Sequence, residues 1–303
     1  MNGYDGSVRG RILDIGHGTT KDGPGWRSIV YFMGCNFRCP WCASPQTIES
    51  TTQLLVHSDL EKYPDRNAAA CPYGAVTVDG EKTRTDRAFC RKCVTFDCVE
   101  KCIDGSREYA GKEVGVAEII SELLKYRRFH REYGVTISGG EPTVQWGFFI
   151  ELLKACKQEG FHTAVETNGS SDKLVEALEY LDLVICDLKH FDSKRHKELT
   201  GCSNELVIQN IQSIAKSKKP VWIRIPVIPG VTDGENLDNS AEFLSRLEGD
   251  LKVEIIGYHR LGLHTWEALG REYALKDIVP YSETELEEIR EKFKSYGLDV
   301  IKT

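Results

Sequence analysis

The sequence lacks the features that mark a membrane protein or a nucleic-acid-binding protein. None of its apolar stretches approaches the length of a membrane-spanning helix, and the first residues, from Met1 to Gly6, lack the basic-then-apolar pattern of a signal peptide. Positive charge is not in excess, because 39 Lys and Arg stand against 46 Asp and Glu and give a net charge of −7. This balance argues against a general binder of nucleic acid or of anionic membranes. We therefore expect a cytoplasmic protein that has neither as a partner.

Cysteine, by contrast, is abundant, with 11 residues in a chain of 303. Disulfides are rare in the cytoplasm, so this number of cysteines indicates metal binding or catalysis. Eight of the eleven lie between Cys35 and Cys102. The length allows one large α/β domain or two smaller domains.

The most informative motif has the spacing Cys-x3-Cys-x2-Cys and consists of Cys35, Cys39 and Cys42, with Trp41 before the last cysteine. Three thiolates this close can converge on one metal centre and leave one coordination position open. A structural zinc ion or a fully ligated iron–sulfur cluster takes four protein ligands. A 4Fe–4S cluster held by three cysteines keeps one iron free to bind a small molecule, so we predict that these cysteines are metal ligands at a catalytic site. Half of a zinc site, or a set of buried structural thiols, is the alternative.

From about Val116 onward, helical and strand patterns alternate along the sequence. The patterns predict strands at 27–34, 135–137, 161–166, 183–187, 221–226 and 253–257, and helices at 116–124, 149–156, 174–181 and 283–296 and on either side of Gly201. Such alternation requires parallel strands with helical crossovers, whose chemistry gathers at the carboxyl ends of the strands. Polar residues follow successive predicted strands and should surround one opening: Glu141, Glu166, Asp187 and His259.

The alternation stops between about residues 45 and 112, where five cysteines occur and long apolar runs are few. We therefore divide the chain into residues 1–44, a separate small insert at 45–112, and residues 113–303. The first part begins the α/β domain and the third part completes it.

The cysteines of the insert resemble those of a two-cluster bacterial ferredoxin that has lost half of its ligands. Such ferredoxins repeat Cys-x2-Cys-x2-Cys-x3-Cys-Pro twice, and the last cysteine of each repeat ligates the other cluster. Cys71, which precedes a proline, resembles the end of the first repeat. Counting back from it places Asn67, Pro64 and Glu61 where the other three cysteines would stand. One cluster should therefore survive rather than two.

Crosswise ligation predicts which cysteines hold the surviving cluster: Cys71, Cys90, Cys93 and Cys98. Cys102 is then left over. The interval between Cys93 and Cys98 is two residues longer than in the ferredoxin repeat. A local set in which Cys102 replaces Cys71 is the competing choice, and a zinc site in the insert is a further alternative.

The whole ordered set of motifs resembles the glycyl-radical-enzyme activating enzymes of the radical SAM superfamily, of which pyruvate formate-lyase activating enzyme is the best-known type. Besides the cysteine motif, the segments that carry this resemblance are Asp22 to Arg27, Ser138 to Pro142, Glu166 to Gly169, Asp187 to Lys189, Arg224 to Asp233, and Tyr258 to Gly262. The resemblance covers nearly the whole chain, and the insert resembles that of the longer family members. It implies an α/β fold, namely a partial (β/α)6 TIM-like barrel with a small ferredoxin-like insert.

The resemblance also implies cofactors and the residues that bind them. S-adenosylmethionine would bind to a 4Fe–4S cluster on the three-cysteine motif, and a second 4Fe–4S cluster would lie in the insert. The positions that match cofactor-binding positions of the family are Trp41, Gly139, Gly140, Glu141, Asp187, Leu188, Lys189, Arg224 and His259. A monovalent cation is expected near Glu166, Thr167 and Asp187, with Glu166 standing where the best-known member has an aspartate.

The activity that the resemblance implies is that of an anaerobic oxidoreductase. It would cleave S-adenosylmethionine reductively and use the 5′-deoxyadenosyl radical to take a hydrogen atom from a backbone glycine of a partner glycyl radical enzyme. A flavodoxin or a ferredoxin would supply the electron. The insert cluster would pass electrons inward or would dock the electron donor or the partner. The alternatives are a radical SAM enzyme acting on a small molecule or a peptide, a ferredoxin-like electron carrier whose barrel is only a scaffold, and a structural zinc protein.

Overall fold

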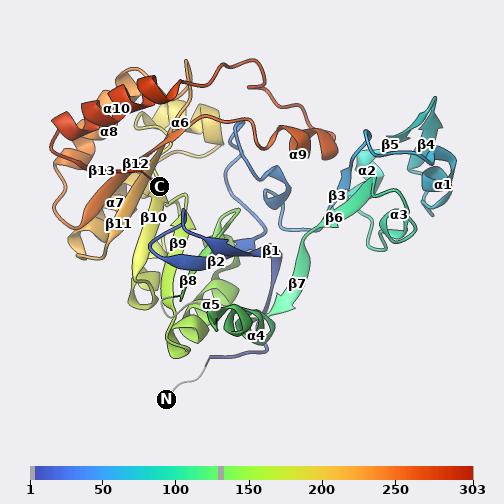
Figure 1. The fold of residues 1–303 in the computed structure, drawn as a ribbon, viewed down its shortest axis with the longest axis horizontal. Helices are drawn as coiled ribbons and strands as arrows, with labels where there is room; N and C mark the ends of the chain where they lie inside the picture. The colour runs from blue at the N-terminus through green and yellow to red at the C-terminus, as the bar shows by residue number, and fades with distance from the viewer. Residues whose placement is uncertain (1–3, 129–132, 303) are drawn as a thin grey trace.

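The structure, a computed structural model, describes residues 4–128 and 133–302, so Met1, Asn2 and Gly3 of the N-terminal stretch lie outside the described residues (Figure 1). A nine-stranded sheet forms its centre. The strands are β1 (Arg9–Thr19), β2 (Trp26–Phe32), β7 (Lys112–Gly115), β8 (Tyr133–Gly139), β9 (His162–Thr167), β10 (Leu183–Asp187), β11 (Val221–Val227), β12 (Leu251–Gly257) and β13 (Asp299–Ile301).

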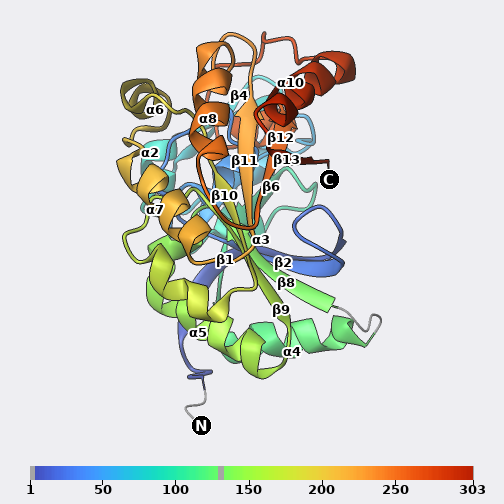
Figure 2. The same cartoon turned by 90° about the vertical axis from the view of Figure 1, so that its left-hand side faces the viewer.

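The order of the strands is β13-β12-β11-β10-β9-β8-β2-β1-β7. Strand β2 and the strands from β8 to β13 are parallel, whereas β1 is antiparallel to both β2 and β7. The helices of this part are η1 (Pro45–Thr47), α4 (Val116–Arg127), η2 (Pro142–Gln145), α5 (Trp146–Gln158), η3 (Leu174–Tyr180), α6 (Ser193–Thr200), α7 (Glu205–Lys216), α8 (Glu235–Ser245), α9 (Leu263–Ala268) and α10 (Glu283–Ser295). Helices α5, α7 and α8 lie along one side of the sheet (Figure 2). The predicted α/β class and partial barrel are confirmed.

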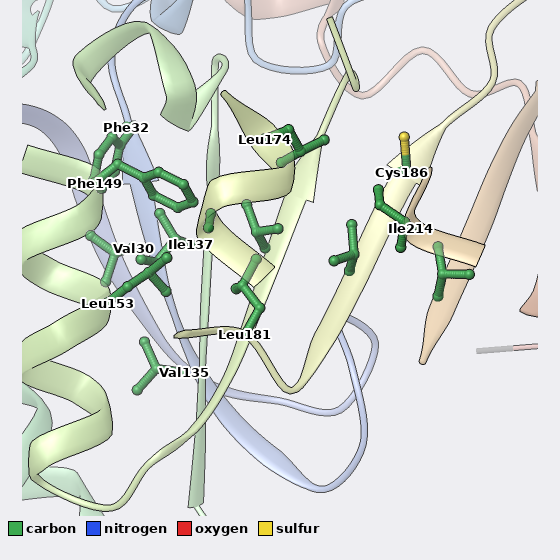
Figure 3. Packing of buried hydrophobic residues seen from close by; sticks show 14 of the residues in the cluster. Val30, Phe32, Val135, Ile137, Phe149, Leu153, Leu174, Leu181, Cys186 and Ile214 are labelled. Atoms are coloured by element: carbon green, nitrogen blue, oxygen red, sulfur yellow. The ribbon is translucent and has the colours of Figure 1, made fainter. Parts of the chain in front are cut away.

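The core lies between the sheet and these helices because the central strands are apolar on both faces, as parallel strands covered by helices must be. In β10, the residues from Leu183 to Cys186 are all buried. The helix α5 carries buried residues at helical spacing, among them Phe149 and Leu153, which pack beside Val30 of β2 and Ile137 of β8 (Figure 3). This packing fixes the strand ends from which the candidate site residues project.

Most of the predicted elements are present. The strand 183–187 has the predicted bounds. The helix α10 starts with the expected capping box, in which Ser282 N–H donates to Glu285 at 2.7 Å. The segment predicted as a helix at 174–181 is the 3₁₀-helix η3. A 3₁₀-helix rises by about 2.0 Å per residue rather than about 1.5 Å, so this short connection spans more of the distance from β9 to β10.

The insert is built from two small antiparallel sheets and three short helices: β3 (Gln53–Val56), α1 (Pro64–Ala69), β4 (Val76–Asp79), β5 (Lys82–Thr85), α2 (Arg87–Cys90), α3 (Asp97–Glu100) and β6 (Arg107–Ala110). It lies to one side of the barrel (Figure 1). Strand β3 leads the chain into the insert, and its partner β6 leads the chain out. The small hydrophobic core of the insert includes Leu54, Val56 and Cys98. Among the described residues, every helix is too short or too polar to cross a bilayer.

Candidate active site

Cys35, Cys39 and Cys42 line one cavity, which opens at the carboxyl ends of the parallel strands. They lie on the loop that follows β2. The other residues that line this cavity are Phe37, Trp41, Ala43, Thr47, Ile48, Ser138, Gly139, Gly140, Glu166, Thr167, Asn168, Asp187, Lys189 and Arg224. The structure thus brings together residues that are up to 189 positions apart in the sequence, from Cys35 to Arg224.

The three thiols are held in a buried environment. Burial raises the pKa of Cys35 and Cys42 to about 11 and that of Cys39 to about 12, and the nearby Lys189 ammonium opposes the rise at each of them. The thiols are therefore protonated at neutral pH and must release protons when they bind a metal. Among the described residues, no three His, Cys, Asp or Glu side chains are arranged to hold a single metal ion. The sulfur atoms instead lie on the wall of a cavity that is open toward charged groups, and this donor set fits a cluster with one free iron.

Two glycines allow the end of β8 to approach the cysteine loop. A Cβ atom on Gly140 would lie 2.2 Å from the carbonyl oxygen of Gly34, and one on Gly139, where φ is +114°, would lie 2.3 Å from the backbone of Phe32. Backbone hydrogen bonds join the two segments, from Gly140 N to Phe32 O at 2.9 Å and from Glu141 N to Gly34 O at 2.8 Å. The glycines are therefore required for packing between these backbones, in addition to any contact with a ligand.

Glu141 is completely buried and lies behind the cavity wall. Its carboxylate accepts hydrogen bonds from Asn168 N at 2.7 Å, from Thr143 Oγ1 at 2.6 Å and from Thr167 Oγ1 at 2.9 Å. Burial raises the pKa of Glu141, and these donors oppose the rise. The carboxylate thereby ties the end of β8 to the end of β9. The structure makes Glu141 a positioning residue for the cavity.

The charged side chains of the cavity form pairs. Glu166 and Arg224 make an ion pair, and Arg224 Nε also donates to Glu254 at 2.6 Å. At the end of the neighbouring strand β10, where Asp187 is in register with Arg224, Lys189 Nζ donates to Asp187 at 2.8 Å. Burial raises the pKa of Glu166 to about 7, and the Arg224 guanidinium opposes that rise. Both cations and both carboxylates of these pairs are half-buried or buried, so their charges are weakly screened by water.

Each of the three residues expected around a monovalent cation already contacts another side chain of the protein. Glu166 is paired with Arg224, Thr167 with Glu141, and Asp187 with Lys189. An added cation would therefore compete with two fixed cationic side chains.

Three of the residues that were predicted to bind the cofactor do not line the cavity. Glu141 and Leu188 are buried behind it, and His259 is exposed after β12. Sequence reasoning missed six residues that do line it: Phe37, Ala43, Thr47, Ile48, Ser138 and Asn168. Ser138 and Asn168 stand inside recognised motifs and could have been named from their position. Thr47 and Ile48 lie at the 3₁₀-helix η1, which no motif marks.

A second cavity lies in the insert and is lined by Cys71, Cys90, Cys93 and Cys98. Burial raises the pKa of both Cys90 and Cys98, and the neighbouring thiols of the set raise it further. The remaining walls are almost wholly apolar, formed by Leu54, Pro72, Tyr73, Ala75, Val76, Phe89 and Phe96, with Asp97 as the one carboxylate. The structure thus brings together the four cysteines of the predicted ligand set that includes Cys71. The thiol of Cys102 lies elsewhere and donates to Asp104 at 3.1 Å.

The positions of the missing ferredoxin cysteines are occupied by a buried polar network. Asn67 Nδ2 donates to Glu61 and to Ser106 Oγ, each at 3.1 Å. Glu61 also forms an ion pair with Arg107 at 3.6 Å, in which both side chains have no solvent exposure. The thiol of Cys102 lies 3.6 Å from the same Ser106 hydroxyl. Asn67 and Glu61, two of the three residues that stand where the ferredoxin pattern would have cysteines, are therefore neighbours joined by a hydrogen bond.

Comparison with known proteins gives matches over most of the chain. The model of the Radical SAM superfamily matches residues 29–244. The indoleacetate decarboxylase activating enzyme of Tractidigestivibacter scatoligenes is 32% identical over 314 residues, which cover 99% of each chain. The choline trimethylamine-lyase activating enzyme of Oleidesulfovibrio alaskensis is 33% identical and covers 95% of this chain and 96% of its own. The crystal structure of Streptococcus suis SuiB bound to precursor peptide SuiA has a similar fold, with a TM-score of 0.53 and 16% identity over 90% of this chain and 47% of that chain.

Proposed function

This chain belongs to the radical SAM superfamily, and we propose that it is an oxidoreductase that activates a partner glycyl radical enzyme. Cys35, Cys39 and Cys42 would hold a 4Fe–4S cluster, which would supply one electron for the reductive cleavage of S-adenosylmethionine to methionine and a 5′-deoxyadenosyl radical. Transfer of one hydrogen atom from the Cα of a glycine in the partner would then leave 5′-deoxyadenosine and a glycyl radical.

The observation that carries this proposal is the composition of a single cavity. Three thiols, the cations Lys189 and Arg224, and the carboxylates of Glu166 and Asp187 all line this cavity. The methionyl part of S-adenosylmethionine carries a carboxylate, which these two cations suit, and an amino group, which Glu166 and Asp187 suit. A site that held only a metal would need no such charged wall. We assign Trp41, Gly139 and Gly140 to the same ligand because they complete the wall.

The residues of the chain then have distinct tasks. The thiols hold the cluster, the paired charges orient the methionyl group, and the buried Glu141 fixes the strand ends that carry them. The apolar side chains of Phe37 and Ile48 line the same cavity and limit the access of water to it. We propose no direct contact between the cofactor and Leu188 or His259, because neither residue lines the cavity.

We further propose that the insert holds a second 4Fe–4S cluster on Cys71, Cys90, Cys93 and Cys98. This proposal is supported by their shared cavity and by the separate hydrogen bond of Cys102. It is also supported by the apolar walls, which suit a closed cluster that binds no substrate. A monovalent cation near Glu166, Thr167 and Asp187 would compete with Arg224 and Lys189 for the two carboxylates, so we propose that it is not needed for the binding of S-adenosylmethionine.

The remaining assignments are proposals of the same kind. A flavodoxin or a ferredoxin fits as the electron donor, because the reaction consumes one electron. A cytoplasmic location fits because all eleven cysteines are free thiols. The division into 1–44, 45–112 and 113–303 is supported by the two small sheets of the insert, which are separate from the main sheet.

The test uses the whole protein reconstituted with iron and sulfide without oxygen. S-adenosylmethionine and a chemical reductant should yield 5′-deoxyadenosine, and a suitable partner should then show a glycine-centred doublet in electron paramagnetic resonance. The partners to try first are the enzymes for which the relatives are named, indoleacetate decarboxylase and choline trimethylamine-lyase. Cys39→Ser should abolish both signals, whereas Cys156→Ala, a change at a buried cysteine of α5, should leave them. Full turnover of a small molecule or a peptide without any partner would contradict the proposal.

A further inference from the structure

The short helix α9 packs directly on the loop of the three-cysteine site. The indole Nε1 of Trp266 donates to the carbonyl oxygen of Cys42 at 2.9 Å. Gly262, just before the helix, lies so close that a Cβ atom on it would be 2.6 Å from the same oxygen. Only a glycine permits this approach. Gly262 and Trp266 thus fix α9 to the last cysteine of the motif.

The other end of α9 meets the insert. Arg87 Nη2 donates to Ala268 O at 2.6 Å, while Nη1 of the same guanidinium donates to Leu54 O of β3, also at 2.6 Å. A Cβ atom on Gly270 would lie 3.1 Å from Arg87 Nε. Arg87 stands at the start of α2, and Cys90 stands at its end. The helix α9 therefore lies between the two cysteine cavities and is hydrogen-bonded toward both (Figure 1).

Two guanidinium groups also lie between the cavities. Arg271, which follows α9, interacts electrostatically with Cys42 on one side and with Arg87 on the other. Arg87 in turn interacts with Cys90. Positive charge beside a thiolate-bound iron–sulfur cluster favours its reduced and more negative state. Both sites are thereby biased toward accepting an electron.

From these contacts we propose that α9 is the electron path from the insert to the three-cysteine site, with Trp266 as the positioning residue toward Cys42 and Arg87 as the positioning residue toward the insert. The inference rests on the proposed function and assigns a role to the insert. A low-potential flavin or iron–sulfur protein gives one electron to the insert cluster and is itself oxidised by one electron. The same electron then moves to the cluster on Cys35, Cys39 and Cys42, and the insert cluster returns to its oxidised state. No bond is formed or broken in this transfer.

The test follows the reduction of both clusters by freeze-quench electron paramagnetic resonance, with flavodoxin hydroquinone as the probe and the fully reconstituted protein as the acceptor. The signal of the insert cluster should appear first, and that of the three-cysteine site second. Trp266→Phe keeps the aromatic contact with Tyr273 but removes the hydrogen bond to Cys42. It should slow the second phase about tenfold at unchanged iron content. Trp222→Phe, at a half-buried tryptophan of β11, is the matched control and should change nothing.

A reduction potential provides a readout that a merely structural role would not move. Arg87→Gln removes a positive charge near Cys90, so the potential of the insert cluster should become more negative in a redox titration. Arg84→Gln, at an exposed arginine of β5, should leave that potential unchanged.

Two results would overturn the inference: transfer at the wild-type rate in Trp266→Phe, or reduction of the three-cysteine site at the wild-type rate in Cys71→Ser, which should lack the insert cluster. If Cys71→Ser does not fold, Trp266→Phe alone decides. Failure of the proposed function would look different, because the wild-type protein would then yield no 5′-deoxyadenosine even with titanium(III) citrate as the reductant.

Discussion

The two cysteine cavities of this protein differ in the groups that surround the sulfur atoms. The cavity of Cys35, Cys39 and Cys42 has three thiols and a wall of paired charges. The cavity of the insert has four thiols and walls that are almost wholly apolar. Because buried charges are costly unless they are paired or meet a ligand, the charged wall indicates a site that binds a charged molecule. The apolar walls fit the proposed cluster with four protein ligands, which would leave no position for a further molecule. The number of cysteines and the polarity of the wall thus lead to the same distinction between a reactive site and a closed one.

The largest expected effect concerns Cys39, the most buried of the three thiols at the first cavity. Cys39→Ser should remove the cluster of the reactive site and lower the yield of 5′-deoxyadenosine more than about a thousandfold, because the reaction depends on that cluster. The iron content should fall from about eight atoms per chain to about four, since each cubane holds four. Retention of about eight iron atoms would show that Cys39 is not a ligand.

A pair of substitutions distinguishes the two possible sets of cysteine ligands in the insert. Cys71→Ser should lower the iron content to about four atoms per chain, because Cys71 lines the insert cavity. Cys102→Ser should leave the iron content at its wild-type value, because that thiol is hydrogen-bonded to Asp104 outside the cavity. The opposite pattern would favour the local set of four cysteines.

The reactive site should also depend on backbone contacts that the closed site does not use. In Gly140→Ala, the new Cβ atom would lie 2.2 Å from Gly34 O and 2.7 Å from Thr47 O, so the cysteine loop must shift. We expect a loss of about 1–3 kcal/mol of stability and weaker binding of S-adenosylmethionine, measured by thermal unfolding and calorimetry. Gly147→Ala is the matched control, because nothing lies within 4 Å of the added atom. It should stabilise the helix α5 by up to about 1 kcal/mol.

The polar half of the insert should be sensitive to acid. Asp104 accepts hydrogen bonds from Lys62 N at 2.9 Å and from Ser106 N at 3.0 Å. Burial opposes its charge, but these donors hold the pKa of Asp104 well below its ordinary value. Its contribution to stability is therefore complete above about pH 4 and is lost as the pH falls toward the lowered pKa. Amide hydrogen exchange of the cluster-free insert should show this loss, of about 1 kcal/mol.

Asp104→Asn provides the control, because its side chain carries no charge that could be lost. The stability of that variant should vary less between pH 5 and pH 2, in the range where Asp104 of the unfolded wild-type chain takes up a proton and Asp104 of the folded protein stays charged. Equal acid sensitivity of the two proteins would exclude this role of Asp104.

The smallest expected effect concerns monovalent cations at the reactive site. Since Glu166 and Asp187 are paired with Arg224 and Lys189, the affinity for S-adenosylmethionine should agree within about twofold between potassium, sodium and choline salts of equal ionic strength. Glu166→Asp shortens the side chain that reaches Arg224 and should make the affinity depend on the cation. A strong dependence in the wild-type protein would show that a cation displaces these pairs.

Much of the fold could be predicted from the sequence because its central strands and helices have strong apolar periodicity. The strand 183–187 and the capping box at Ser282 are examples. Strands β1 and β7 were missed because both contain many polar residues and glycines, and because β7, at the edge of the sheet, pairs with β1, which lies far away in the sequence. The helix α9 was missed because it has only six residues.

The candidate site was predictable where residue type and chemistry coincide, as for the cysteines, Lys189 and Arg224. It was not predictable where position depends on tertiary packing. His259 follows a strand, as the cavity residues do, yet it is exposed. Glu141 has the residue type of a ligand-binding group, but the loops that surround it use its carboxylate to join two strand ends.

The pairing of β3 with β6 places the entry and the exit of the insert beside each other, with Gln53 opposite Ala110. A short turn could join these two positions without changing the path or the order of any barrel strand. The insert is therefore of a kind that evolution can gain, lose or exchange in one genetic event while the strands of the main sheet keep their path and order.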